Sequence, residues 1–218
     1  MSTAHLPAND VLALLETSLK RDGRVALATI IETWGSAPVP VGGQMAIAAD
    51  GGFAGSVSGG CVEGEVITEA VELLDGGAPR TLSFGVEDET AWRVGLPCGG
   101  QIRVFVERLE GDADHAYAAA LTQARTDREA LVVRTRLADG VRQIVRRSDA
   151  PADGDLARRF LSGISNVEAG ADGEMFVHAR LPPPRIVIIG ATTPPEIALA
   201  VLAEILRHLR GIKGKGAA

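Results

Sequence analysis

The feature that most constrains this chain is a glycine-rich segment that leads directly into a helical pattern. The segment reads Gly55-Ser56-Val57-Ser58-Gly59-Gly60-Cys61-Val62-Glu63-Gly64. Behind it, apolar residues recur at helical spacing, at Val62, Val66, Ile67, Ala70, Val71 and Leu74. The pattern predicts a turn that opens a helix, with Cys61 in the first helical turn. Backbone N–H groups point outward there and the helix dipole favours an anion, so thiolate character is expected at Cys61.

The second of the two cysteines lies in a similar setting, Gly95-Leu96-Pro97-Cys98-Gly99-Gly100-Gln101. A Gly-Gly pair precedes one cysteine and follows the other, which suggests that two loops converge on one bound group. Thiolates are soft ligands, and glycines let backbone N–H groups approach a ligand closely. The candidate binding residues are Cys61, Cys98, Ser58, Gly59, Gly60, Gly99 and Gly100, with Gln44 as a further amide.

Composition and charge exclude several classes of function. The net charge of −6 argues against a nucleic-acid binder. No apolar run reaches the ~20 residues that span a bilayer, and the first ten residues do not resemble a signal peptide. The cysteines are therefore expected to be thiols and the compartment to be the cytoplasm. His5, His115, His178 and His208 share no metal-ligand spacing, so no zinc site is expected.

Local patterns predict the elements of the chain. A first helix is capped by Asn9 or Asp10 and ended by Gly23. Strands are predicted at 25–31, 44–49, 53–57, 81–84, 102–106, 129–136, 141–147 and 174–179, and further helices at 112–128 and 155–165. Glu63 and Glu65 are expected on the solvated face of the Cys61 helix, where they complement its dipole.

The last part of the chain predicts one buried strand, Arg185 to Gly190, and a helix from Pro194 to Leu209. A dinucleotide site needs G-x-G-x-x-G after the strand and an acidic residue about 20 positions later. Neither is present, so no binding of NAD is expected.

Three spaced motifs, Gly35-Ser36-Ala37-Pro38 and the two cysteine segments, together resemble the XdhC/CoxI family. The resemblance implies a maturation factor, and not an enzyme with turnover of its own, for molybdenum hydroxylases such as xanthine dehydrogenase. It implies binding of the molybdenum cofactor (molybdopterin), help with its sulfuration and insertion into the apo-enzyme. Cys61 and Cys98 would contact the cofactor. The implied partners are an apo molybdenum hydroxylase, a cysteine desulfurase and a second copy of the chain in a homodimer.

The sequence departs from this family at two places. Val39 stands where many relatives carry arginine, which weakens an expected contact to an anionic group. The strand at 185–190 is followed almost at once by what resembles the last helix of a Rossmann-like domain, so the middle of that domain is missing from the pattern.

The predicted fold is therefore α/β, with a mixed-sheet N-terminal domain over residues 1–110 and a smaller α/β region over 111–180. A residual Rossmann-like strand and helix with a tail occupies 181–218. Two other functions remain open. The first is a thiol redox protein in which Cys61 and Cys98 cycle between dithiol and disulfide. The second is a scaffold that docks the client enzyme without binding the cofactor.

Overall fold

The computed structural model describes residues 10–85, 100–183 and 201–202. The chain divides into two compact units, Met1–Pro182 and Pro183–Ala218, and strands β1 to β9 all lie in the first. Cys98, Gly99, the predicted strand at 185–190 and most of the helix predicted at 194–209 lie outside the described residues.

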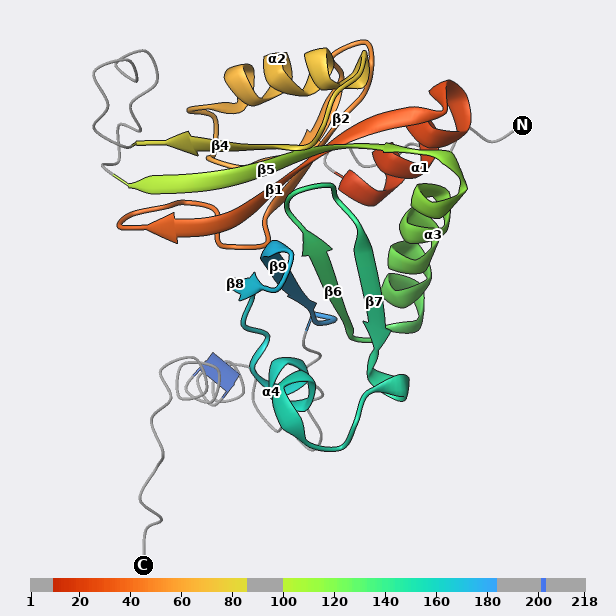
Figure 1. The fold of residues 1–218 in the computed structure, drawn as a ribbon, viewed down its shortest axis with the longest axis vertical. Coiled ribbons are helices and arrows are strands. Elements are labelled where there is room, and N and C mark those ends of the chain that lie inside the picture. Colours follow the sequence, from red (N-terminus) through yellow and green to blue (C-terminus); the bar gives the residue numbers. More distant parts are fainter. Residues whose placement is uncertain (1–9, 86–99, 184–200, 203–218) are drawn as a thin grey trace, which may run out of the picture. The chain divides into compact units, whose positions relative to one another are not determined.

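The first sheet has five antiparallel strands in the order β3-β2-β1-β5-β4 (Figure 1). They are β1 (Arg24–Trp34), β2 (Gln44–Ile47), β3 (Phe53–Gly55), β4 (Arg80–Phe84) and β5 (Gln101–Glu110). The long pair β1 and β5 forms the centre, paired from Arg24 with Glu110 to Trp34 with Gln101. The expected α/β class is confirmed, with the difference that the described ladders are antiparallel where a mixed sheet was expected.

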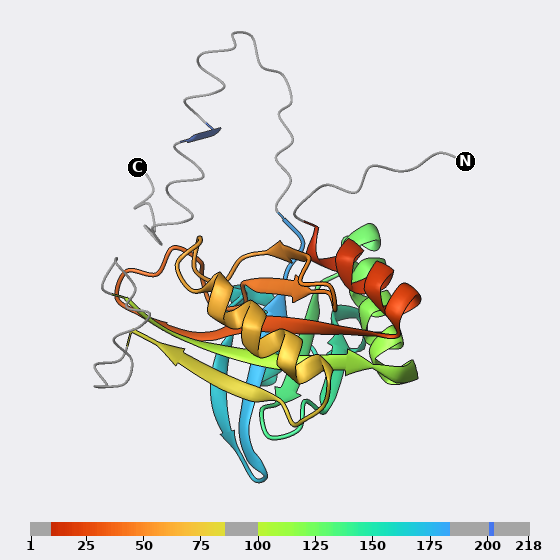
Figure 2. The ribbon, with the colours of Figure 1, turned by 90° about the horizontal axis from the view of Figure 1, so that it is seen from above.

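Helices α1 (Val11–Asp22) and α2 (Glu63–Leu74) pack on this sheet. Figure 2 shows α2 lying across the strands. Side chains alternate along β1, so Ala26 and Ala28 share a buried cluster with Val66 of α2, while Leu27 shares a different cluster with Leu15 of α1. Both faces of the sheet are therefore buried, which explains why β1 reads as a continuous apolar run.

Both predicted ends of the first helix are confirmed. The Asp10 carboxylate accepts hydrogen bonds from the N–H groups of Leu12, at 3.1 Å, and Ala13, at 3.2 Å. Gly23 has a φ of 72° in the left-handed region and donates its N–H to the carbonyl of Leu19. A capping carboxylate and a terminal glycine are local signals, which is why the sequence was sufficient to predict them.

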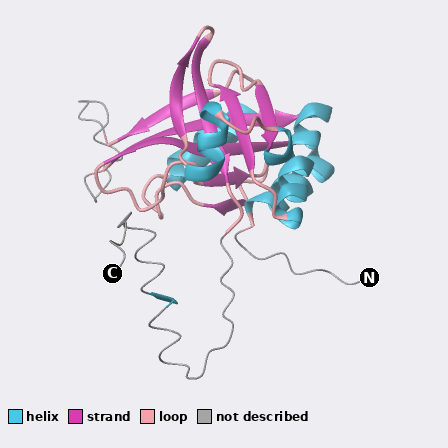
Figure 3. Cartoon of the chain, turned by 90° about the horizontal axis from the view of Figure 1, so that it is seen from below, coloured by secondary structure: helices cyan, strands magenta, loops and turns pink. Residues whose placement is uncertain are grey.

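The second sheet, also antiparallel, has the order β7-β6-β9-β8, and Figure 1 labels its four strands. Figure 3 shows the strands of both sheets in magenta. Its strands are β6 (Leu131–Arg136), β7 (Arg142–Arg146), β8 (Asn166–Gly170) and β9 (Gly173–Arg180). Helix α3 (Gly111–Asp127) precedes it, and the 3-10 turn η1 (Arg147–Asp149) and helix α4 (Gly154–Ser162) follow β7. The sequence did not predict β8, although the Asp172-Gly173 pair that ends its hairpin turn is a recognised signal.

Ion pairs and shared core residues connect the two sheets. Arg103 of β5 contacts Glu32 of β1 at 2.5 Å and Glu174 of β9 at 2.7 Å. Leu131 and Val133 of β6 belong to the same buried cluster as residues of α1 and β1. The two sheets therefore share a core within one compact unit.

A buried ionic cluster lies where β5, α3 and β7 meet. Arg142 forms ion pairs with Glu107 and, at 2.5 Å, with Asp114, and its guanidinium carbon is 4.6 Å from the centre of the Tyr117 ring. Burial raises the pKa of Glu107 to about 7, although the charge of Arg142 opposes this shift. The positive charge of Arg142 compensates the cost of burying the negative charge of the Glu107 carboxylate.

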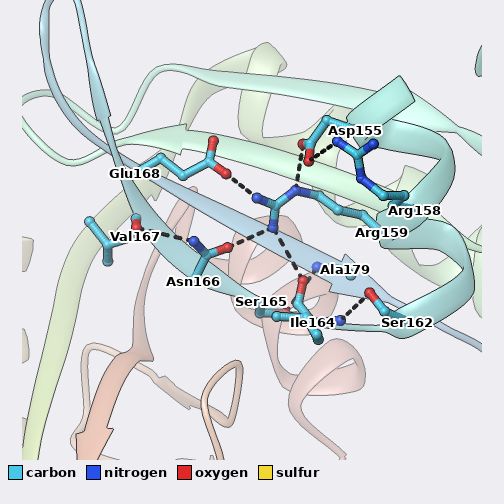
Figure 4. Close-up of polar contacts among 10 residues, drawn as sticks. All are labelled: Asp155, Arg158, Arg159, Ser162, Ile164, Ser165, Asn166, Val167, Glu168 and Ala179. Atoms are coloured by element: carbon cyan, nitrogen blue, oxygen red, sulfur yellow. Dashed lines mark hydrogen bonds and ion pairs between the residues drawn. The ribbon is translucent and has the colours of Figure 1, made fainter. Parts of the chain in front are cut away.

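Helix α4 is attached to β8 by Arg159 (Figure 4). Its guanidinium donates to Asp155 at 2.9 Å, to Asn166 at 2.6 Å and also to Glu168. Arg159 is only 8% exposed. One nearly buried side chain thus joins the helix to an edge strand.

Candidate functional site

Two loops and the start of β5 meet at one end of the first sheet. The loop after β1, residues 35–43, is called the proline loop, and the one after β3, residues 56–62, the cysteine loop. A Cβ atom built on Gly59 would lie 3.5 Å from Cγ of Pro38. One built on Gly100 would collide with the Ser36 carbonyl oxygen and lie 3.2 Å from that of Trp34. Both glycines therefore border the segment 34–38, so the structure brings parts of all three sequence motifs together.

Within the cysteine loop, the carboxylate of Glu63 is the centre of a dense set of hydrogen bonds. Glu63 is only 8% exposed. Its Oε1 accepts from Ser56 Oγ at 2.6 Å and from the N–H groups of Val57, Ser58 and Gly59 at 3.2, 2.9 and 3.1 Å. Its Oε2 accepts from Ser58 Oγ at 2.5 Å and from the Gly60 N–H at 2.9 Å.

Ser58 completes this arrangement at the start of α2. Its hydroxyl donates to Glu63 and accepts from the N–H groups of Cys61, at 2.9 Å, and Val62, at 3.0 Å. Ser58 is 2% exposed, so its hydroxyl faces the loop and not solvent. Together, Glu63 and Ser58 accept hydrogen bonds from every backbone N–H from residue 57 to residue 62.

The electrostatics of Glu63 follow from these bonds. Burial alone would raise the pKa of its carboxyl, but the hydrogen bonds from Ser56 and Ser58 outweigh burial and lower the pKa to about 2. The group is a permanent anion at neutral pH, placed where the helix dipole is positive. The prediction that Glu63 lies on the solvated face of the helix is wrong, because its side chain turns back into the loop. A carboxylate close behind serines and glycines at a helix start is the signal that could have indicated this.

Cys61 lies two residues before α2, slightly earlier than predicted, and its side chain is exposed with a free thiol. Gly59 and Gly60 precede it with φ angles of 81° and 116°, in the region that other residues rarely adopt. The loop therefore directs its backbone donors inward and leaves the thiol of Cys61 accessible. Cys98 and Gly99 lie outside the described residues, so their position beside Cys61 stays a prediction.

Gln44, predicted as a further ligand contact, uses both ends of its amide within the protein. Its Nε2 donates to Thr29 Oγ1 at 3.1 Å, and its Oε1 accepts from Arg180 at 2.5 Å. Gln44 thus links β1, β2 and β9 below the cysteine loop.

Sequence reasoning did not single out Trp34, the last residue of β1. Its side chain is 48% exposed, and its backbone adjoins Gly100. An exposed indole next to the loops offers a flat apolar surface on which an aromatic ring system can stack. The signal in the sequence was its place directly before the Gly35-Ser36-Ala37-Pro38 motif.

Metal sites and membrane spans can be assessed for the described ranges alone. These ranges contain no group of three or more His, Cys, Asp or Glu side chains arranged to hold a metal ion. No described helix has the length and apolar character needed to cross a membrane.

The chain resembles a family profile, several curated proteins and a solved structure. The XdhC and CoxI family profile matches residues 18–85. The molybdenum cofactor insertion chaperone PaoD of Escherichia coli is 40% identical over 83 residues, which cover 38% of this chain and 26% of that protein. A protein of Bacillus subtilis described as a probable xanthine dehydrogenase subunit is 31% identical over 106 residues, 48% of this chain and 32% of that protein.

A solved structure described as a xanthine dehydrogenase from Bacillus halodurans has a TM-score of 0.55 and 23% identity, over 79% of this chain and 53% of its own. This likeness shows the fold alone. The chain spans about a third or less of the two curated relatives. The match to the XdhC and CoxI family profile thus includes the proline loop, the cysteine loop and Glu63.

Proposed function

We propose that this chain binds the molybdenum cofactor at the cysteine loop, assists its sulfuration and passes it to an apo molybdenum hydroxylase of the xanthine dehydrogenase type. The observation that carries the proposal is the exposed thiol of Cys61 on a loop held by Glu63. This loop lies in the segment that matches the XdhC and CoxI family profile, and the chain is 40% identical over 83 residues to a molybdenum cofactor insertion chaperone.

The residues present fit one end of the cofactor. Molybdopterin carries its metal on a pair of sulfur atoms and has a phosphate at the other end. The thiol of Cys61 is a soft donor suited to the metal or to sulfur. The backbone donors of the loop are unsuited to the phosphate, because Glu63 and Ser58 already occupy them. The cofactor, when bound, would supply the metal and sulfur chemistry that the client enzyme needs.

The second cysteine belongs to the same proposal. Gly100 adjoins the proline loop, and we propose that Cys98 and Gly99 also contact the ligand. A homodimer, a cytoplasmic location and a cysteine desulfurase that supplies sulfur are the remaining parts of the proposal. They rest on the family resemblance.

The experiment measures molybdenum and pterin in protein purified from cells that make the cofactor. The native chain is expected to retain both, and Cys61→Ala to lose most of each while its circular dichroism is unchanged. Thr68→Ala, a change on the exposed face of α2, is the matched control. Equal retention in Cys61→Ala would refute the role of the thiol. A Cys61–Cys98 disulfide in protein that contains no pterin would favour a thiol redox protein instead.

A further inference from the structure

The cysteine loop has no backbone N–H left for an external ligand. The N–H of Ser56 donates to the Gln44 carbonyl at 3.2 Å, those of residues 57–60 donate to Glu63, and those of 61–62 donate to Ser58. The hydroxyls of Ser56 and Ser58 also donate to Glu63. Six donors therefore surround one carboxylate.

This arrangement resembles an anion-binding loop that already contains its anion. Successive N–H groups at a helix start usually form a concave site for phosphate or sulfate. Here the carboxylate of Glu63 occupies that place, and hydrogen bonds to an ionised acceptor are stronger than those between neutral groups. The carboxylate of Glu63 thus fixes the shape of the loop and also occupies its anion position.

We propose that Glu63 is a positioning residue, an internal anion that fixes the cysteine loop and closes it to phosphate, so that within this loop only the side chain of Cys61 meets the sulfur-bearing end of the ligand. The part that concerns the ligand rests on the proposed function. The part that concerns the loop rests only on the hydrogen bonds of Glu63, and the two are tested separately.

The central variant is Glu63→Ala, which removes the carboxylate and leaves its donors in place. Exchange of the amide hydrogens of residues 57–60, followed by NMR, is expected to accelerate by about tenfold or more. Formate or inorganic phosphate should then enter the vacated place, slow this exchange and raise the melting temperature. The native protein should show no such response to either anion.

Glu65→Ala is the matched control, because Glu65 is an exposed carboxylate two residues further along α2. It should leave both the exchange and the response to anions as in the native protein. Glu63→Gln serves if Glu63→Ala does not fold. The glutamine amide keeps one acceptor oxygen, but its NH₂ group replaces the second oxygen and faces other donors. Only part of the protection of the amide hydrogens of residues 57–60 against exchange should therefore be lost.

Native-like exchange in both Glu63 variants, or binding of phosphate at the loop of the native protein, would overturn the positioning role. Molybdenum and pterin retention is measured on the same samples. If the native chain carries neither but exchange and rescue by formate follow the expectation, the proposed function fails and the role of Glu63 stands. If Glu63→Ala loses the cofactor with unchanged exchange, Glu63 acts on the ligand directly and the positioning role is refuted.

Discussion

The carboxylate of Glu63 and the hydroxyl of Ser58 are 2.5 Å apart, and this pair organises the loop that carries Cys61. The hydroxyl donates a hydrogen bond to the carboxylate and accepts hydrogen bonds from the N–H groups of Cys61 and Val62. A serine five residues before the carboxylate thus holds the two N–H groups that directly precede α2, whose N-cap residue Val62 forms no side-chain cap of its own. The relationship has consequences for stability, for pH dependence and for ligand binding.

Ser58→Ala is expected to lower the free energy of unfolding by about 1–2 kcal/mol, because it removes the acceptor of the Cys61 and Val62 N–H groups and one donor to Glu63. Urea denaturation followed by circular dichroism measures the change. The control is Ser83→Ala, at an exposed position of β4, which should shift stability far less. Equal effects of the two substitutions would show that the hydroxyl of Ser58 contributes nothing specific.

The low pKa of Glu63 predicts a defined loss of stability in acid. The folded-state pKa is about 2 and the ordinary value is 4.5. The stabilisation is therefore fully present above pH 4.5 and declines as the pH falls from 4.5 through 2. It amounts to at most on the order of 3 kcal/mol, and less where solvent screens the carboxylate. The difference in unfolding free energy between the native chain and Glu63→Gln should shrink over this range, and a constant difference would contradict the assignment.

Arg142→Leu is expected to destabilise the protein by about 3–5 kcal/mol, because it leaves the buried carboxylate of Glu107 without its counter-charge. Adding Glu107→Gln should recover part of the loss, since the remaining amide carries no charge. A double-mutant cycle in denaturant measures both effects. If Glu107→Gln lowers the free energy of unfolding further, Glu107 has another partner in the folded protein.

Arg159→Lys should loosen α4 while leaving the first sheet intact. A lysine cannot reproduce the fork that contacts Asp155, Asn166 and Glu168 together. Amide exchange in α4 and β8 should accelerate, with that in β1 and β5 unchanged. Arg158→Lys, an exposed neighbour on the same helix, is the control, and a uniform change across the protein would contradict a local role for Arg159.

Trp34→Ala is expected to reduce pterin retention with little loss of stability, because the indole is half exposed beside Gly100 and can stack on a flat ring. Phe53→Ala offers a matched comparison, since Phe53 is another exposed aromatic residue, at 49%, on β3. Phe53→Ala should leave pterin retention unchanged. Equal losses in both variants, or none in either, would exclude stacking on Trp34.

The sequence was most informative where the cause of a structure is local. Asp10 and Gly23 gave the ends of α1 because a cap and a left-handed glycine act within a few residues. Strand β8 escaped prediction because Asn166 to Gly170 is short and contains only one strong strand former, Val167, and its pairing with β9 defines it. The extent of β5 was underestimated for a similar reason, since its pairing with β1 continues to Glu110.

The site itself depended on long-range contacts. The approach of Gly100 to Ser36 follows from the pairing of β1 with β5, which no local pattern encodes. Glu63 could have pointed to solvent or into the loop, and only the path of residues 56–60 decides between them. The sequence could therefore indicate that residues near Cys61 matter. It could not indicate that the anion bound by the loop is the carboxylate of Glu63 from the same chain.

Gln44 has one more consequence. Its backbone carbonyl accepts from the Ser56 N–H, its Nε2 donates to Thr29, and its Oε1 accepts from Arg180 at the end of β9. One residue thereby joins the base of the cysteine loop, the central strand of the first sheet and the last residue of the second. Displacing any one of these three parts relative to the others strains a hydrogen bond of Gln44, so the Ser56 N–H at the base of the cysteine loop and the guanidinium of Arg180 are held by the same residue.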